Sequence, residues 1–216
     1  MSRTSGSVAG APLVDALPLG REIFKHAGTV STLDRARLLR QRPSTVWLTG
    51  LSGAGKSTLA YEMERRLLAR GSLSFVLDGD NLRHHLNRDL GFSARDRQEN
   101  IRRAAEVASL MNEAGLIVFS ALISPRREDR AMARTIVGES RFVEVHMSAD
   151  LTVCESRDPK GLYAKARAGL ISEFTGVSAP YEEPEAPALR LDAGRLTLEQ
   201  AADELMNVLH GLGVLQ

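Results

Sequence analysis

Gly50-Leu-Ser-Gly-Ala-Gly-Lys-Ser57 is the most informative stretch of this sequence. It follows a short apolar run at residues 45–49 and precedes a helical run at residues 58–70. Its glycines permit backbone angles that other residues avoid, so successive N–H groups can turn toward one anion. The positive end of the following helix adds to that attraction. The Gly-x-x-x-x-Gly-Lys-Ser spacing between a strand and a helix therefore predicts a loop that binds the phosphates of a nucleotide.

The nucleotide is expected to be ATP. Lys56 can reach the β- and γ-phosphates, and the Ser57 hydroxyl can be a ligand of Mg²⁺. Nothing in the sequence matches the Asn-Lys-x-Asp element that recognises guanine, and the apolar run 116–123 does not end in a Walker B acid. The loop residues expected to bind ATP are Gly50, Leu51, Ser52, Gly53, Ala54, Gly55, Lys56, Ser57 and Thr58.

Short apolar runs alternate with helical segments along the rest of the chain. This pattern is typical of a parallel sheet whose strands are joined by crossover helices. Capping boxes are expected at Ser93 with Asp96, before a helix over 96–114, and at Thr197 with Gln200, before the last helix. The sequence thus predicts a three-layer α/β fold of the P-loop NTPase class with a five-stranded parallel sheet. The predicted strands are residues 45–49, 73–77, 116–123, 142–146 and 188–191.

The domain organisation is simple. A length of 216 residues suits one α/β domain. We predict a flexible tail over residues 1–20 and a domain over residues 21–216. Between the fourth and fifth strands, basic residues and a proline-rich stretch interrupt the alternation, and we predict a lid segment there, over about residues 150–187.

Composition argues against several classes of protein. The formal net charge of +1 does not suit a nucleic-acid-binding surface. No apolar run approaches the roughly 20 residues that cross a membrane. The single cysteine, Cys154, cannot form an internal disulfide, so a reducing cytoplasm is the expected location. A targeting peptide in the Ser- and Ala-rich tail is the less favoured alternative.

Two acidic residues follow the second apolar run, in Asp78-Gly79-Asp80. If the strand continues through them, its two-residue period places both carboxylates on the same side. The carboxyl ends of parallel strands are where α/β sheets bind ligands. One carboxylate could then accept a proton from an attacking hydroxyl while the other helps to hold Mg²⁺. A solvated turn is the alternative for this fragment alone.

Together with further motifs, these residues resemble the adenylyl-sulfate kinase family. The resemblance covers about residues 23–187 and is most specific in Leu77-Asp-Gly-Asp-Asn81, Arg157-Asp-Pro-Lys-Gly-Leu-Tyr163 and Phe174-Thr-Gly176. It implies transfer of the γ-phosphoryl group of MgATP to the 3′-hydroxyl of adenosine 5′-phosphosulfate, in sulfate assimilation. It also implies a homodimer, and it makes ATP sulfurylase, which is often fused to such kinases, a candidate partner.

The resemblance also implies roles for individual residues. Asp80 is implied to activate the acceptor hydroxyl, and Asp78 to lie near Mg²⁺. Lys56 is implied to act on the transferred phosphoryl group, and Phe92 and Phe174 to stack on the two faces of the acceptor's adenine. The other residues implied to contact the acceptor are Asn81, Arg83, Arg97, Asn100, Ile123, Ser124, Lys160 and Leu162.

Ser124 and Cys154 each leave two interpretations open. Ser124 either relays the phosphoryl group covalently or only hydrogen-bonds the acceptor during direct transfer; we favour direct transfer, since no base is adjacent in the sequence. Cys154 is implied, with Arg157, at the ATP site, yet a lone cysteine is more often a small buried hydrophobe than a reactive thiol. The chain departs from the family's usual pattern at His85 and Arg126.

Two other functions stay in view. One is a related small-molecule kinase with a different hydroxyl acceptor, such as a sugar, which has no need of two aromatic plates. The other is a nucleotide-binding regulatory module without turnover. The intact Lys56, Ser57, Asp80 and Arg83 argue against the second.

Overall fold

The computed structural model describes residue 26 and residues 28–215. The predicted tail, residues 1–20, lies outside the described residues, as do residues 21–25, 27 and 216 of the predicted domain. Along the part that is described, no helix is both long and apolar enough to cross a membrane.

Five parallel strands form the central sheet, in the order β2-β3-β1-β4-β5. Their observed bounds differ from the predicted ones by no more than two residues at either end. The prediction of a five-stranded parallel α/β sheet is therefore confirmed. The strands are β1 (Thr45–Thr49), β2 (Ser74–Asp78), β3 (Ile117–Ala121), β4 (Phe142–Ser148) and β5 (Leu189–Asp192).

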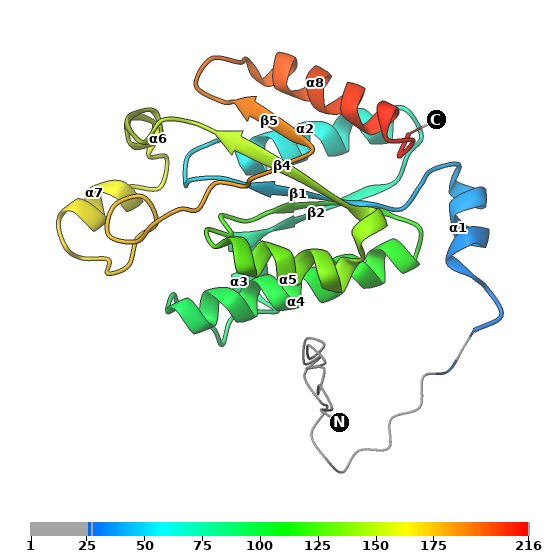
Figure 1. The fold of residues 1–216 in the computed structure, drawn as a ribbon, viewed down its shortest axis with the longest axis horizontal. Coiled ribbons are helices and arrows are strands. Elements are labelled where there is room, and N and C mark those ends of the chain that lie inside the picture. The colour runs from blue at the N-terminus through cyan, green and yellow to red at the C-terminus, as the bar shows by residue number, and fades with distance from the viewer. Residues whose placement is uncertain (1–25, 27, 216) are drawn as a thin grey trace, which may run out of the picture.

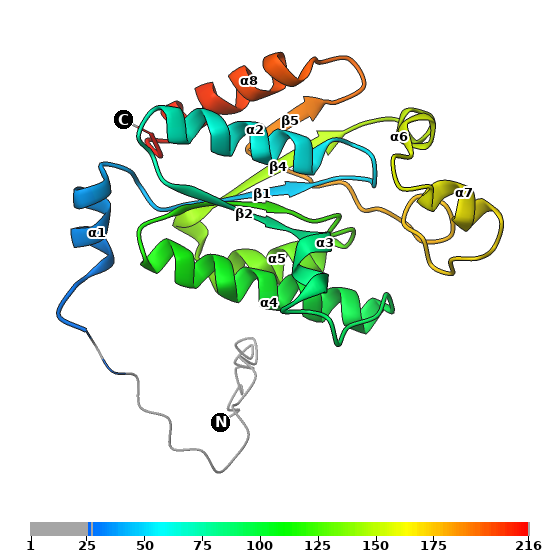
Figure 2. The same cartoon turned by 180° about the vertical axis from the view of Figure 1, so that it is seen from behind.

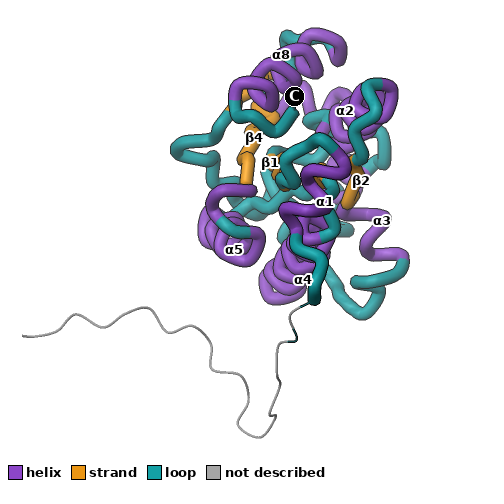
Figure 3. The backbone as a smooth tube through the Cα atoms, turned by 90° about the vertical axis from the view of Figure 1, so that its right-hand side faces the viewer, coloured by secondary structure: helices purple, strands orange, loops and turns teal. Residues whose placement is uncertain are grey.

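Helices cover both faces of the sheet and give three layers (Figures 1 and 2). The helices α2 (Lys56–Ala69) and α8 (Leu198–Gly211) pack on one face, and α4 (Ala94–Glu113) and α5 (Arg127–Val137) on the other. Viewed along the strands, the two helix pairs lie on opposite sides of the sheet (Figure 3). The remaining short helices are α1 (Thr32–Leu39), α3 (Gly79–His84), η1 (Glu139–Arg141), α6 (Leu151–Arg157) and α7 (Leu162–Arg167).

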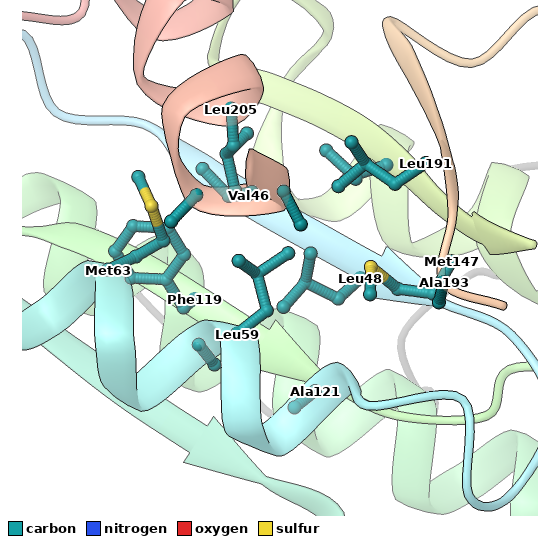
Figure 4. Close-up of a cluster of buried hydrophobic side chains, with 14 of the residues drawn as sticks. Val46, Leu48, Leu59, Met63, Phe119, Ala121, Met147, Leu191, Ala193 and Leu205 are labelled. Atoms are coloured by element: carbon teal, nitrogen blue, oxygen red, sulfur yellow. The ribbon is translucent and has the colours of Figure 1, made fainter. Parts of the chain in front are cut away.

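The core is split in two by the sheet, because alternate side chains of a strand point to opposite faces. From β1, Val46 and Leu48 enter the cluster beneath α2 and α8, whereas Trp47 enters the cluster beneath α4 and α5. Figure 4 shows the first cluster, where Leu59 and Leu205 meet the strand residues from the two helices. Each such buried side chain contributes about 1.5–3 kcal/mol relative to an exposed one. The β1 strand, and the phosphate loop that follows it, are therefore held from both faces.

The two predicted capping boxes have different outcomes. At α8, Thr197 Oγ1 accepts the Gln200 N–H at 3.2 Å and Gln200 Oε1 accepts the Thr197 N–H at 2.9 Å, so that box is confirmed. At α4, Ser93 Oγ accepts the Asp96 N–H at 3.1 Å. Asp96 Oδ2, however, accepts the N–H of Gly91 at 3.2 Å instead of returning to Ser93. The predicted capping box at Ser93 is therefore wrong for its second hydrogen bond, because the Asp96 carboxylate accepts from the Gly91 N–H and not from the Ser93 N–H.

The predicted lid segment, residues 150–187, contains α6, α7 and the coil that leads to β5. It extends beyond the carboxyl ends of the strands (Figure 1). Its return limb, residues 180–183, comes back against the sheet through Tyr181 and Glu182. That the segment opens and closes stays a prediction.

Candidate functional site

A cavity of about 1110 Å³ lies at the carboxyl ends of the strands, between the phosphate loop, the start of α4, the loop after β3 and the lid segment. Pockets that hold one small molecule measure roughly 300–1000 Å³. The cavity brings together most residues of both predicted substrate sites. Those that line it are Ser52, Gly53, Ala54, Gly55, Lys56, Ser57, Thr58, Asp78, Asp80, Arg83, Phe92, Arg97, Asn100, Ile123, Ser124, Arg157, Lys160, Leu162 and Phe174.

Four predicted site residues do not line this cavity. Gly50 shapes the start of the loop, and Leu51 borders a shallower hollow on its other side. The Asn81 amide donates to the Tyr61 hydroxyl at 3.0 Å. Cys154 is fully buried behind the loop, and burial raises the pKa of its thiol. A buried, protonated thiol favours the packing interpretation of Cys154.

The phosphate loop has the backbone shape that its glycines predict. Gly50, Gly53 and Gly55 have φ angles of +149°, +77° and +89°, values that residues with a side chain rarely adopt. Gly55 is also the N-cap of α2. A Cβ atom at Gly50 would lie 2.4 Å from the carbonyl oxygen of Met147 on the neighbouring strand. Glycine is therefore required at residue 50 for two separate reasons, conformation and space.

Gly50→Ala is expected to lower the free energy of unfolding and to weaken ATP binding. The positive φ alone costs roughly 1–2 kcal/mol, and the loss should exceed this because the added Cβ also meets the Met147 carbonyl. The matched control is Gly138→Ala in the turn after α5, where φ is +97° but no atom lies within 4 Å of the added Cβ. Chemical denaturation and ATP titration of both variants check this. The prediction would be contradicted if Gly50→Ala and Gly138→Ala lost the same free energy of unfolding and Gly50→Ala bound ATP as tightly as wild type.

Lys56 is folded over its own loop. Its Nζ donates to the carbonyl oxygens of Gly50 at 2.9 Å and Leu51 at 2.7 Å, and the residue is 7% exposed. Burial lowers the pKa of Lys56 to about 8. The ammonium group is thus hydrogen-bonded to two loop carbonyls, and the charges of Asp78 and Asp80 act on its pKa in the direction opposite to burial.

The two aspartates follow β2 but do not share a strand. The Asp78 carboxylate caps α3: its Oδ1 accepts the N–H groups of Asp80 at 2.9 Å and Asn81 at 3.2 Å. The strand therefore ends at Asp78, and Asp80 lies in the first turn of the helix. The strand-period argument for placing the two carboxylates together was wrong, although both side chains do line the cavity.

Ser57 and Asp78 supply a plausible donor set for Mg²⁺. Ser57 Oγ donates to Asp78 Oδ2 at 2.5 Å, at the point where the phosphate loop meets the end of β2. A hydroxyl and a carboxylate are hard oxygen donors, and Mg²⁺ commonly binds through one or two protein ligands together with substrate phosphates and water. The residues present therefore fit the ion that the sequence predicts.

Asp80 forms an ion pair with Lys160, which reaches it from the lid segment. Both side chains are more than half exposed, so the pair is solvated and contributes little to folding stability. It does place a cation from the lid segment beside the carboxylate predicted to act as the base.

The two phenylalanines predicted to stack on the acceptor lie on different elements. Phe92 precedes α4, is 65% exposed, and carries the Arg83 guanidinium 4.5 Å from its ring centroid. Phe174 belongs to the lid segment, is 7% exposed, and packs edge-on against Tyr163 with 5.0 Å between ring centroids. Both line the cavity, and Phe174 is largely buried in this conformation.

Arg97 joins the segments that carry these two rings. Its Nε donates to the Phe92 carbonyl at 2.9 Å, its Nη1 donates to Thr175 Oγ1 at 2.9 Å, and its Nη2 donates to the Glu173 carbonyl. Asn100, one turn further along α4, accepts a hydrogen bond from the Asn87 amide at 2.9 Å. Arg97 and Asn100, which are both predicted to contact the acceptor, therefore also form hydrogen bonds with other residues of the protein.

Ser124 has a buried hydroxyl. Its Oγ accepts from Trp47 Nε1 at 3.1 Å and lies 3.4 Å from the Leu122 carbonyl, to which it donates. The residue is 2% exposed and has a φ of +40°, which is unusual for a residue with a side chain. Within the described part of the chain, this hydroxyl hydrogen-bonds only the Trp47 indole and the Leu122 carbonyl, and neither is a base.

Three buried or partly buried residues that pack beside the end of β1 were not predicted from the sequence. They are Tyr181, His146 and Arg130. Tyr181 Oη hydrogen-bonds Thr49 Oγ1 at 2.9 Å, its ring stacks on His146 with centroids 5.8 Å apart, and Arg130 lies above the ring. Arg130 stands in a charged run that suggests a solvated helix face, and Tyr181 in a proline-rich stretch without periodicity. No local pattern marks either as buried.

His146 is buried beneath the site, and burial lowers its pKa to about 4, with the positive charges of Arg190 and Arg130 acting in the same direction. An unfolded histidine titrates near 6.5. Between these values the unfolded chain binds the extra proton. The free energy of unfolding is therefore expected to fall as pH drops from about 6.5 toward 4, by up to about 1.4 kcal/mol per pH unit from this group.

Denaturation of wild type and His146→Gln across this pH range tests the assignment, with His210→Gln, at an exposed position of α8, as the control. The wild-type curve should be steeper than that of His146→Gln. Parallel curves for these two proteins would contradict it.

The fold and the site define a P-loop phosphotransferase, because a glycine-rich loop with its lysine and serine, the carboxylates of Asp78 and Asp80 and the lid segment all line one cavity. Residues 42–192 match the model of the adenylylsulphate kinase family. The chain is 53% identical to the adenylyl-sulfate kinase of Shewanella amazonensis over 87% of its own length and 94% of that protein. The chain belongs to the adenylyl-sulfate kinase family.

Further comparisons agree with this membership. The structure of Mycobacterium tuberculosis APS kinase CysC in complex with AMPPNP and APS is similar, with a TM-score of 0.76 and 50% identity over 79% of this chain and 99% of that one. The bifunctional enzyme NodQ of Azospirillum brasilense is 50% identical over 99% of this chain, which spans 35% of NodQ. The prediction of an ATP-dependent adenylyl-sulfate kinase is confirmed, in preference to a different small-molecule kinase or a regulatory module.

Proposed function

We propose that this chain transfers the γ-phosphoryl group of MgATP directly to the 3′-hydroxyl of adenosine 5′-phosphosulfate, giving 3′-phosphoadenylyl sulfate and ADP. The observation that carries the proposal is one cavity that is lined by both the phosphate loop and two aromatic rings. Asp80 and Lys160, which form an ion pair, line the same cavity. The related M. tuberculosis structure contains a nucleotide analogue and APS together.

On the ATP side, the loop N–H groups and Lys56 bind the phosphates. An arriving triphosphate offers Lys56 anionic oxygens in place of the Gly50 and Leu51 carbonyls, and charged acceptors make stronger hydrogen bonds. Ser57 and Asp78 would hold Mg²⁺, which supplies charge neutralisation on the β- and γ-phosphates. The Lys56 ammonium stabilises the negative charge that moves toward ADP as the γ-phosphoryl bond breaks.

On the acceptor side, Phe92 and Phe174 hold the adenine between them, and stacking leaves the ribose directed toward the phosphate loop. Arg83, Arg97 and Lys160 supply positive charge for the phosphosulfate. As the 3′-oxygen bonds to the γ-phosphorus and the bond to ADP breaks, Asp80 accepts the hydroxyl proton. Lys160 keeps a cation beside the carboxylate that performs this step.

Direct transfer is preferred to a relay through Ser124. A covalent relay needs an exposed hydroxyl with an adjacent base. The Ser124 hydroxyl is buried and bonded to the Trp47 indole. In-line transfer between two bound nucleotides needs only positioning and charge neutralisation.

A coupled ADP-release assay with adenylyl sulfate, gluconate, shikimate and AMP tests the acceptor, and ³¹P NMR of the product tests the position of transfer. ADP release is expected with adenylyl sulfate and Mg²⁺ together. Release at an equal rate with gluconate or shikimate would overturn the acceptor assignment. Titration of adenylyl sulfate into the ADP complex should show a second binding event, and competition between the two nucleotides would overturn the shared cavity.

Family membership also motivates two proposals about assembly. The first is a homodimer, which light scattering of the purified protein tests. The second is docking with ATP sulfurylase, which sedimentation of the two purified proteins together tests. A monomer in the first experiment, or independent sedimentation in the second, would remove the corresponding proposal.

A further inference from the structure

Arg130 on α5 has a buried guanidinium group that contacts three separate parts of the chain. The side chain is 3% exposed. Its Nε donates to Glu144 Oε1 on β4 at 2.8 Å, its Nη1 to the Ser124 carbonyl at 2.7 Å, and its Nη2 to the Glu182 carbonyl at 2.7 Å. The Arg130 side chain does not line the cavity, so it has no direct contact with either proposed substrate.

The hydrogen bond from Nη1 acts on the Ser124 loop, defined here as residues 122–126 between β3 and α5. Ser124 has a positive φ, and such a conformation persists only when its surroundings hold it. Its carbonyl accepts hydrogen bonds from Arg130 Nη1 and, at 3.3 Å, from Thr49 Oγ1. Arg130 is therefore one of the groups that hold a strained backbone at the wall of the cavity.

The hydrogen bond from Nη2 acts on the return limb of the lid segment, through the Glu182 carbonyl. The Glu182 N–H donates to the Pro125 carbonyl at 2.8 Å, and Glu182 Oε2 accepts the Arg127 N–H at 2.8 Å. The adjacent Tyr181 hydrogen-bonds Thr49, which immediately precedes the phosphate loop. The Ser124 loop, the lid segment and the end of β1 thus meet around one guanidinium group.

We propose that Arg130 is a positioning residue for phosphoryl transfer, which joins the Ser124 loop to the return limb of the lid segment so that the acceptor side of the cavity keeps one geometry. The proposal rests on the function proposed above. Glu144 fixes Arg130 by pairing with Nε, which leaves Nη1 and Nη2 free to reach the two carbonyls. A lysine at this position would keep the charge opposite Glu144 but could not make three diverging hydrogen bonds in fixed directions.

Arg134 provides a matched control on the same helix. It pairs with the same Glu144 carboxylate at 3.2 Å and with Glu139 at 2.9 Å. Its hydrogen bonds involve neither Ser124 nor Glu182. Arg130→Lys and Arg134→Lys therefore make the same chemical change beside the same carboxylate, and only the first removes the link between the two carbonyls.

The experiment compares wild type, Arg130→Lys and Arg134→Lys in kcat, in KM for adenylyl sulfate and for ATP, and in amide hydrogen exchange. Arg130→Lys is expected to lower kcat/KM for adenylyl sulfate on the order of 10-fold to 100-fold, since small misplacements of a reacting group have effects of this size. Amide exchange should speed up in the same variant at the non-proline residues of the Ser124 loop, 122–126, and of the return limb, 180–183. Arg134→Lys should stay near wild type in both readouts.

Two results would overturn the inference while leaving the proposed function intact: kinetics of Arg130→Lys that match those of Arg134→Lys, or a lower melting temperature with unchanged kcat and KM. Absence of turnover in wild type would instead overturn the proposed function. If Arg130→Lys does not fold, Arg130→Met combined with Glu144→Gln removes both buried charges together and avoids an unpaired carboxylate. The same loss of kcat/KM is expected there, and its absence counts against the inference.

Discussion

Asp80→Asn is expected to lower kcat by roughly 100-fold to 10 000-fold, the usual range for loss of a general base, with little change in ATP affinity. The substitution keeps the size of the side chain but removes the carboxylate that is proposed to accept the 3′-hydroxyl proton. That proton moves only as the reaction proceeds, so the loss belongs to the transition state more than to substrate binding. Steady-state kinetics with adenylyl sulfate and direct ATP titration measure the two effects separately.

Two comparisons make the Asp80 result specific. Lys160→Met breaks the same ion pair but keeps the carboxylate, so its main effect should be on KM for adenylyl sulfate. Asp203→Asn removes an exposed carboxylate on α8, where it pairs with Arg66, and should be neutral. Ser124→Ala, measured alongside, should keep most of its kcat if transfer is direct. Wild-type turnover in Asp80→Asn would rule out its role as the base.

Phe174→Leu is expected to raise KM for adenylyl sulfate by about 5-fold to 150-fold, which corresponds to the roughly 1–3 kcal/mol that an aromatic–base stack contributes. Leucine keeps most of the apolar volume against Tyr163 but removes the aromatic face. KM for ATP should change much less, because the ring is proposed to stack on the adenine of the acceptor. Initial-rate measurements with each substrate varied in turn check both statements.

The choice of leucine matters because Phe174 is largely buried. Alanine would also leave a cavity beside Tyr163, and phenylalanine-to-alanine changes in a core cost about 3–5 kcal/mol in stability. Phe75→Leu, on the half-exposed edge strand β2, controls for loss of an aromatic ring elsewhere. An unchanged KM for adenylyl sulfate in Phe174→Leu would show that the ring is a core residue and not part of the acceptor site.

The sheet and the phosphate loop could be predicted from the sequence because their signals are local. Apolar runs of strand length mark β1 to β5, and the glycine spacing of residues 50–57 determines a backbone shape almost independently of the rest of the chain. The end of β2 could not be predicted in the same way. There, the Asp78 side chain caps α3, and the strand stops two residues before Asp80, through which the two-residue period requires it to continue.

The parts of the site that sequence reasoning missed depend on contacts between distant residues. Arg130 and Glu182 are 52 positions apart, and Arg97 and Thr175 are 78 apart. No periodicity or motif around Arg130 or Tyr181 distinguishes a buried, fully bonded side chain from a solvated one. The burial of Phe174 likewise depends on how two parts of the lid segment pack together, since its ring lies edge-on against Tyr163 of α7.

Two of the three hydrogen bonds of Arg97 join α4 to the lid segment, at Thr175 and at the Glu173 carbonyl, and the third holds the Phe92 carbonyl. On the function proposed above, adenylyl sulfate enters and its product leaves between Phe92 and Phe174, so both passages would loosen these same contacts. A tighter hold on the incoming substrate would then also slow the departure of the product.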